Sequence, residues 1–283
     1  MNNAILLISS PDQKGITASV TQFIFEHRGN ILHADQHIDD QGNIFFMRVE
    51  FSLEGFTLKR EQIADAFKPL AQRFSMDWKL YFSDDTLRMA VFVSKPLHCL
   101  YDIIFRQRTQ QLRCKLPLIV SNHKEASELA TKFNIKFVYM PKDNSNKKEQ
   151  EAKEIELLKK EKIDVIVLAR YHQIFSKGFV EAFPSRIINI HHSFLPAFAG
   201  KNPYAQAYQK GVKIIGATSH YAIEELDEGP IIEQQTVRIS HRDTLADLKH
   251  KGQDLEKVVL YRALRWHLER KILCYGHKTV VFA

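Results

Sequence analysis

Cysteine is scarce in this sequence, and long hydrophobic runs are missing from it. The 283 residues include three scattered cysteines, and none of them pairs with another in a CxxC motif. This pattern disfavours a disulfide framework and a thiolate zinc site. No apolar run approaches the length needed to cross a bilayer, and the first residues lack the basic segment and cleavage site of a signal sequence. We therefore expect no membrane partner and a cytoplasmic location.

Glycine is also missing from a long central part of the chain, between Gly55 and Gly178. A new strand is predicted to begin at about Arg88, and the segment SKPLHCLYD follows it. A phosphorylated substrate would need a glycine-rich loop at such a place, because the amides of that loop cradle the phosphate. The absence of this loop disfavours a phosphorylated acceptor.

Basic residues exceed acidic ones by a small margin. The net charge is +7, from 40 Lys and Arg against 33 Asp and Glu. Such an excess is compatible with a nucleic-acid partner or an anionic substrate. The basic residues are dispersed, however, and the densest group alternates with glutamates as on a solvated helix face. We therefore expect no nucleic-acid partner.

Hydrophobic patterning predicts two domains, of which the first covers residues 1–84. Its strands are predicted around residues 4–9, 31–39, 44–51 and 76–82, and its helices around 16–27 and 60–74. The order β-α-β-β-α-β is the split βαβ arrangement of ferredoxin-like domains. A polar break at Ser83, Asp84 and Asp85 ends this domain.

The second domain, predicted at residues 85–283, alternates strands with helices. Strand patterns at 91–94, 116–122, 165–170 and 187–193 are each followed by a helical pattern. This alternation predicts an α/β fold with a mostly parallel, Rossmann-like sheet. Ligands of such sheets bind at the carboxyl ends of the strands, where residues 189–193 are one candidate segment.

Asn189 and His191 stand two residues apart at the end of a predicted strand, so their side chains point to the same face. An amide can donate a hydrogen bond to a carbonyl oxygen that becomes an oxyanion, and an imidazole can move a proton at the same carbon. Asp227, in an acidic loop closed by Gly229 and Pro230, could orient that imidazole or activate water. Together they predict acyl transfer without a covalent nucleophile.

Other interpretations of these residues remain open. Asn189 could cap a loop, His191 could be a hydrogen-bonded core group, and Asp227 could be a turn residue. Imidazole and carboxylate also suit zinc or iron, and the candidate ligands would be His191, His192, His220 and Asp227. Their spacings match no compact metal motif, so we expect no metal.

The first domain resembles an ACT domain in the segments PDQKGI and GNI. The resemblance implies a module that binds a small amino acid, or serves only to oligomerise, and pairs edge to edge with a copy of itself. We therefore expect a homo-oligomer. An effector would sit where the first helix begins, because helix N-termini favour anions. The effector-binding residues implied are Asp12, Gly15, Ile16, Asn30 and Ile31. Arg28 departs from the small residue that is usual there.

The second domain resembles the formyltetrahydrofolate-dependent formyltransferases and hydrolases in the segments INIH, GATSH and LDEGPII. The resemblance implies that Asn189, His191 and Asp227 surround the formyl carbon and that residues 223–229 hold the pterin. His172 stands where the family more often carries Met. The substrate-binding residues implied are Tyr171, His172, Gln173, Ile174, Thr218, His220, Ile223, Glu224, Glu225, Leu226 and Gly229.

From end to end the chain resembles the formyltetrahydrofolate deformylases, also in HCLYDIIFR, NPYAQAYQKGVKIIGATSHY, RWHLE and HKTVVF. The resemblance implies hydrolysis of 10-formyltetrahydrofolate to formate and tetrahydrofolate, without a cofactor, for one-carbon balance and purine synthesis. Two alternatives stay open: a formyltransferase with an unidentified amine acceptor, and a non-catalytic folate-binding regulator. The missing glycine-rich loop favours water as the acceptor.

Overall fold

The computed structural model describes residues 2–143, 145–197 and 202–283, and the chain forms two compact units. One unit runs up to Thr86 and includes Glu269–Tyr275 and Val280–Ala283, whereas the other comprises Leu87–Leu268 and Gly276–Thr279. The division at residues 84 and 85 stays a prediction of where separate domains begin. Among the described residues, no helix combines the length and the apolar character that a membrane span requires.

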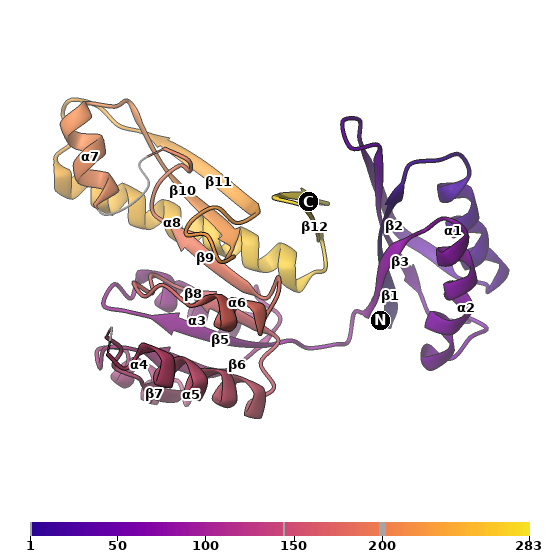
Figure 1. The fold of residues 1–283 in the computed structure, drawn as a ribbon, viewed down its shortest axis with the longest axis horizontal. Helices are drawn as coiled ribbons and strands as arrows, with labels where there is room; N and C mark the ends of the chain where they lie inside the picture. Colours follow the sequence, from indigo (N-terminus) through magenta and orange to yellow (C-terminus); the bar gives the residue numbers. More distant parts are fainter. Residues whose placement is uncertain (1, 144, 198–201) are drawn as a thin grey trace. The chain divides into compact units, whose positions relative to one another are not determined.

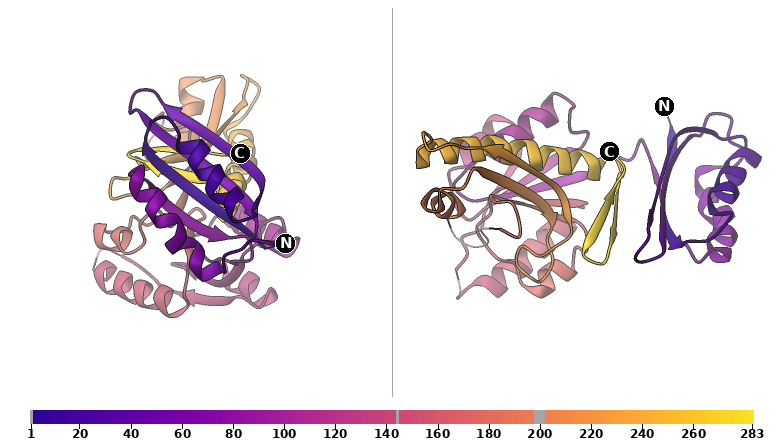
Figure 2. Two further views of the ribbon diagram at one scale, coloured as in Figure 1. Left: turned by 90° about the vertical axis from the view of Figure 1, so that its right-hand side faces the viewer. Right: turned by 90° about the horizontal axis from the view of Figure 1, so that it is seen from above.

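The first unit contains a four-stranded antiparallel sheet in the order β2-β3-β1-β4. Its elements are β1 (Asn3–Pro11), α1 (Ile16–Glu26), β2 (Asn30–Asp39), β3 (Ile44–Ser52), α2 (Arg60–Arg73) and β4 (Asp77–Phe82). Both helices lie on one face of this sheet (Figures 1 and 2). The predicted β-α-β-β-α-β order and fold class are confirmed.

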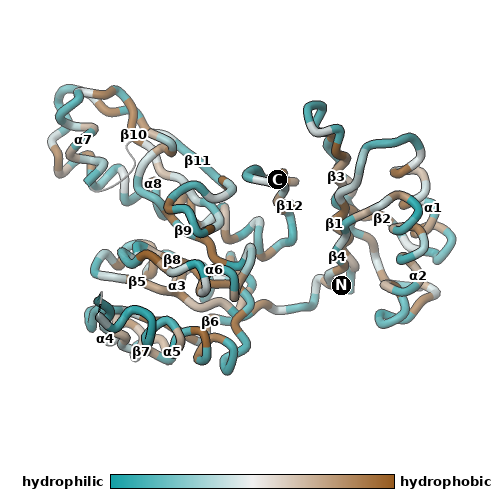
Figure 3. Tube along the Cα trace, in the orientation of Figure 1, coloured by the Kyte–Doolittle hydropathy of each residue, from teal (hydrophilic) through white to brown (hydrophobic). Residues whose placement is uncertain are grey.

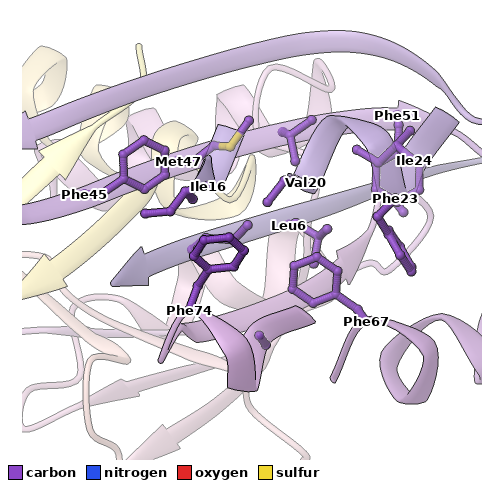
Figure 4. Packing of buried hydrophobic residues seen from close by; sticks show 14 residues of the cluster. Leu6, Ile16, Val20, Phe23, Ile24, Phe45, Met47, Phe51, Phe67 and Phe74 are labelled. Atoms are coloured by element: carbon purple, nitrogen blue, oxygen red, sulfur yellow. The ribbon is translucent and has the colours of Figure 1, made fainter. Parts of the chain in front are cut away.

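Strand β1 has apolar residues at five successive positions, Ala4 to Ile8, because both of its faces are buried there, and Figure 3 colours much of it brown. Leu6 and Ile8 point into the core beneath the helices, part of which Figure 4 shows. Leu7 points the other way and packs with Phe46 and Phe282. A strand covered on both faces needs apolar side chains at successive positions, so the alternating pattern of a half-exposed strand disappears.

The C-terminal residues form a hairpin of β12 (Ile272–Tyr275) and β13 (Lys278–Val281). Arg48 of β3 donates hydrogen bonds to the carbonyl oxygens of Glu269 and Arg270, at 3.3 and 3.1 Å. Its guanidinium also pairs with Glu50 at 2.9 Å. These bonds satisfy a buried cation and explain why the segment after the last helix belongs to the first unit.

The second unit contains a seven-stranded sheet in the order β11-β10-β9-β8-β5-β6-β7. Its elements are β5 (Arg88–Val93), α3 (His98–Arg108), β6 (Lys115–Ser121), α4 (Ser127–Lys132), β7 (Lys136–Tyr139), α5 (Lys147–Lys160), β8 (Val165–Leu168), α6 (Lys177–Glu181), β9 (Ile187–His191), α7 (Pro203–Lys210), β10 (Ile214–Tyr221), β11 (Ile231–Arg238) and α8 (Leu245–Leu268). Strands β5 to β9 run parallel, whereas β10 and β11 are antiparallel to their neighbours. The predicted mostly parallel, Rossmann-like sheet is thus confirmed.

The order of strands reverses between β5 and β8. From β5 the chain proceeds outward through β6 and β7, and it then returns to place β8 on the other side of β5 and β9 beyond it. Such a switch point is where open α/β sheets bind ligands, outside the carboxyl ends of the strands. Ser94 follows β5, Arg170 follows β8, and Asn189 to His192 lie at the end of β9. The helices of this unit and its sheet can be followed in Figure 1.

Candidate active site

Strands β9 and β10 bring four polar side chains to one face of the sheet. In their antiparallel register Asn189 lies opposite His220, and His191 lies opposite Thr218. Directly opposed residues of an antiparallel pair point to the same side. Thr218 and His220 are buried, with 0% and 2% of their surface exposed. The predicted alternation therefore places Asn189 and His191 together and adds His220 beside them.

The proton on His220 can be placed from its partners. Its Nδ1 lies 3.0 Å from the carbonyl oxygen of Tyr221, which can only accept, so Nδ1 carries the proton. In the neutral ring Nε2 then accepts, and the amide of Asn189 donates to it at 3.1 Å. This bond orients the Asn189 amide and uses one of its two N–H groups, which leaves the other for a ligand oxygen.

Asp227 lies between the two histidines. Its Oδ2 is 3.1 Å from Nδ1 of His191, and its Oδ1 is 3.6 Å from Nε2 of His220. Burial alone would raise the pKa of Asp227, but the hydrogen bond from the neighbouring His191 outweighs it and holds that pKa well below its ordinary value. Asp227 is therefore ionised at neutral pH, and it accepts a hydrogen bond from Nδ1–H of His191.

This arrangement leaves the other ring nitrogen of His191 available for chemistry. His191 is 6% exposed. Its Nε2 is buried and has no hydrogen-bond partner among the residues that the structure describes. Because Nδ1 donates to Asp227, Nε2 of the neutral ring carries a lone pair that can take a proton.

The loop that carries Asp227 is held tightly to the end of β10. Tyr221 donates its backbone N–H to the carbonyl oxygen of Pro230 at 2.9 Å. A Cβ on Gly229 would lie 1.7 Å from the carbonyl oxygen of Tyr221. The sequence Asp-x-Gly-Pro therefore has a structural reason, since only glycine permits this close approach. Gly229 was implied as a substrate-binding residue, and its contact in the structure is with the strand.

The rest of this loop is at the surface. Glu224 pairs with Lys177 at 2.8 Å, and the side chain of Leu226 is 58% exposed. Ile223 is half-buried and Glu225 is exposed. Among the residues that the structure describes, no hydrogen bond or ion pair joins these four loop residues to the three catalytic candidates, and their role in holding the pterin stays a prediction.

The segment after β8 separates into core and surface residues. Tyr171 packs on Phe92 and Phe175, and its hydroxyl lies 3.4 Å from Glu154. Burial raises the pKa of Tyr171. Its side chain therefore belongs to the core. His172 donates its backbone N–H to Ser94 at 3.1 Å.

The other residues of this segment are nearer the surface. Burial, together with the nearby Arg170, lowers the pKa of His172. Gln173 is half-buried, and Ile174 is 54% exposed. Binding of substrate by the four residues from Tyr171 to Ile174 stays a prediction.

The residues implied for an effector are not brought together within one chain. Asp12, Gly15 and Ile16 follow the end of β1 that pairs with Ile44, and Gly15 has a left-handed φ of 94°. Asn30 and Ile31 pair with the opposite end of β3, next to the start of β1. Eight residue steps of about 3.3 Å separate the two ends by roughly 26 Å. An effector that touched both groups would need residues of two chains.

A buried polar network near His191 was not predicted. Glu256 of α8 is fully buried and contacts His98, Arg170 and Tyr204. The signal that could have revealed it is a glutamate on the apolar side of α8, among the buried positions Leu255, Val259 and Leu260. A charged side chain on such a face requires partners from other elements.

Two family models match the chain. The model described as formyl transferase matches residues 87–264, and the model described as ACT domain matches residues 4–72. The formyltetrahydrofolate deformylase of Synechocystis sp. is 53% identical, over 99% of this chain and 98% of its own length. That of Bacillus subtilis is 49% identical, over 98% and 93%.

Solved structures show the same likeness. A formyltetrahydrofolate deformylase from Pseudomonas syringae pv. tomato superimposes with a TM-score of 0.98 at 41% identity, covering 100% of this chain and 95% of that one. Glycinamide ribonucleotide transformylase 1 from Symbiobacterium toebii has a TM-score of 0.67 at 28% identity, covering 72% of this chain and 98% of that one. With both domains matched in this order and relatives aligned along its whole length, the chain belongs to the formyltetrahydrofolate deformylase family.

Proposed function

We propose that this protein hydrolyses 10-formyltetrahydrofolate to formate and tetrahydrofolate. The observation that supports this most is the arrangement of the Asp227 carboxylate on Nδ1 of His191, with Nε2 left free. Asn189 stands beside them on the same strand face. His191 supplies a proton acceptor, and Asp227 supplies the carboxylate that stabilises the charged form of His191. Asn189 supplies a hydrogen-bond donor to the oxyanion.

In the first step Nε2 of His191 takes a proton from water while the water oxygen bonds to the formyl carbon. The π electrons of the formyl group move to its oxygen, and the free N–H of Asn189 donates to the oxyanion that forms. Asp227 accepts a hydrogen bond from Nδ1–H throughout, and its negative charge stabilises the imidazolium. Asp227 and His191 thus position and deprotonate the water together.

In the second step the oxyanion collapses and the bond between the formyl carbon and N10 breaks. The imidazolium of His191 returns its proton to N10, which leaves as the amine of tetrahydrofolate. Formic acid ionises to formate. The atoms balance with water as the one co-reactant, so the proposed chemistry uses no metal and no organic cofactor.

The wider setting is also part of the proposal. The folate substrate binds beside residues 171–174 and 223–229, and the reaction balances one-carbon folates and supplies formate for purine synthesis in the cytoplasm. The exposed edge strand β2 supports pairing of the ACT domain with a second copy, since an unpaired edge is a template for another strand. A monomeric mass in light scattering at micromolar concentration would contradict that pairing.

The test is to mix the purified protein with 10-formyltetrahydrofolate alone and to follow formate. Asp227→Asn and His191→Ala should each lower turnover by about 100-fold or more, because each removes part of the acid-base apparatus. His241→Ala is a matched control, since His241 lies in an exposed turn. Equal turnover by all four proteins would refute the assignment.

The same assay separates the alternatives. A formyltransferase would share the site but would release no formate without an amine acceptor. A folate-binding regulator would bind formylfolate and release no formate under any condition.

A further inference from the structure

The switch point between β5 and β8 is where a second substrate would be expected to bind. The two strand ends are joined there, because Ser94 donates its backbone N–H to the carbonyl oxygen of Arg170 at 3.2 Å. Helix α3 begins four residues after Ser94, at His98. In other sheets of this kind a helix N-terminus at this position holds an anionic group of the ligand.

In this protein a buried carboxylate of the chain itself contacts the side chain of the first residue of that helix. Oε2 of Glu256 lies 2.7 Å from Nε2 of His98, and Oε1 lies 3.4 Å from Nη1 of Arg170. Tyr204 donates its hydroxyl to the same Oε1. Burial alone would raise the pKa of Glu256, but His98 and Arg170 outweigh it and lower that pKa. One ionised carboxylate is therefore surrounded by donors from α3, from α7 and from the segment after β8.

The backbone is shaped to admit Tyr204 to this network. A Cβ on Gly252 of α8 would lie 2.2 Å from the hydroxyl oxygen of Tyr204. Gly252 is one helical turn before Glu256, so a larger residue there would push the phenol away from the carboxylate. Tyr204 itself is 8% exposed. The contact is thus a tight packing of ring against helix.

The network reaches the catalytic residues through a row of rings. The ring centroids of His191 and His192 are 5.1 Å apart, and those of His192 and Tyr204 are 5.7 Å apart. Burial and the nearby Arg170 lower the pKa of His192 to about 3, so this ring is neutral at neutral pH. From His191 to Glu256, side chains of the protein therefore follow one another in contact.

A metal site is the other interpretation of part of this cluster. The ligand atoms of His98, Cys99 and Glu256 lie within 4.8 Å of one another. The guanidinium of Arg170 is on the same carboxylate, however, and a cation there opposes a second cation. Burial and Glu256 raise the pKa of the Cys99 thiol, whereas a metal needs the thiolate. The charges favour a closed network over a metal centre.

We propose that the network of His98, Arg170, Tyr204 and Glu256 fills the switch point and excludes any second substrate larger than water. Tyr204 is its specificity-determining residue, because it connects the buried carboxylate to the rings beside His191. The inference rests on the proposed hydrolysis of 10-formyltetrahydrofolate. It explains how a formyltransferase fold can direct the formyl group to water.

The test adds glycinamide, a small primary amine without a phosphate, as a possible acceptor of the formyl group. In Tyr204→Ala the amine nitrogen should bond to the formyl carbon, the carbon to N10 bond should break, and an amine proton should pass to N10. The product ratio of N-formylglycinamide to formate is measured by mass spectrometry at fixed glycinamide. We expect the ratio for Tyr204→Ala to exceed the detection limit of the assay by about tenfold or more, the scale on which small pockets discriminate, whereas the wild-type protein gives no detectable formylated amine.

A ratio distinguishes the proposal from a merely structural role, since general destabilisation lowers both products together. Tyr208→Ala is the matched control, because Tyr208 lies one turn later on α7 and is 50% exposed. Tyr204→Leu leaves a smaller space and serves if the alanine variant does not fold. An unchanged ratio in a folded Tyr204 variant overturns the proposal.

The wild-type protein provides a test that requires no variant. Glycinamide at the concentration used for the variants should leave its rate of formate release unchanged and give no formylated amine. Inhibition by glycinamide, or formylglycinamide as a product, overturns the proposal. Failure of the wild-type protein to release formate at all is a different result, because it refutes the hydrolase function itself.

Discussion

Gly229→Ala tests whether the geometry of the Asp227 loop determines activity. The φ of Gly229 is not in the left-handed region, so the reason for glycine is space and not backbone freedom. A Cβ there would lie 1.7 Å from the carbonyl oxygen of Tyr221, where real contacts are no shorter than 3.0 Å. The difference means that the loop must move by at least 1.3 Å away from β10.

That movement should reach the catalytic residues. Gly229 is two residues after Asp227, and the strand end that it would push against carries His220. A displacement of about 1 Å at a catalytic group costs on the order of 100-fold in rate. We therefore expect Gly229→Ala to lower kcat for formate release by about 100-fold, comparable with loss of the Asp227 carboxylate.

Gly178→Ala is the control for the general effect of a methyl group. Gly178 lies in α6, and a Cβ there would meet nothing within 4 Å. Alanine should stabilise this helix by about 0.5 to 1 kcal/mol and leave kcat unchanged. Formate release and thermal unfolding are measured for both variants. Turnover of Gly229→Ala within a few-fold of wild type would refute the reasoning from the close contact.

Three further predictions concern single groups. Asn189→Ala should lower kcat for formate release by about 100- to 1,000-fold with a smaller change in KM. A change in KM alone would contradict its role as a hydrogen-bond donor to the oxyanion. Lys142→Met should lower the free energy of unfolding in urea by about 3 to 5 kcal/mol, because it leaves Glu154 buried without the partner that lies 2.7 Å away. Replacing both residues by apolar ones should recover most of the lost stability. The lowered pKa of Asp227 means that its ionised form stabilises the fold above an unfolded-state pKa of about 3.9 and that this contribution is lost as the pH falls through the folded-state pKa. The melting temperatures of wild type and Asp227→Asn should therefore converge below about pH 4, and a constant difference would contradict the shift.

Sequence patterns predicted the features that depend on local periodicity. Alternation along a strand placed Asn189 and His191 on one face, and apolar runs located most strands of both sheets. The same patterns did not predict the direction of β10. Helix α7 lies between β9 and β10, which is typical of a parallel crossover, yet β10 runs antiparallel to β9. That reversal is what places His220 opposite Asn189.

Features that depend on distant partners were not predictable. Nothing near Glu256 in the sequence specifies that His98 and Arg170 will meet it, since they lie 158 and 86 residues away. Likewise, the segments implied for an effector resemble those of ACT domains, but their sequence does not specify the register of the strands. The pairing of β2 with β3 puts Asn30 at the end opposite to Asp12. Register is decided by the packing of whole strands.

The backbone at two charged residues shows why local rules fail at such a site. Arg170 and Asp227 have left-handed φ values of 62° and 61°, a region that usually favours glycine. Such a conformation costs on the order of 1 kcal/mol and persists where the surroundings hold it. Asp227 is held by His191, and Arg170 by Glu256. Glycine would relax the backbone but would remove the charge that each partner needs. At these two positions a charge must meet its partner, so the chain keeps a residue that local propensity would not predict.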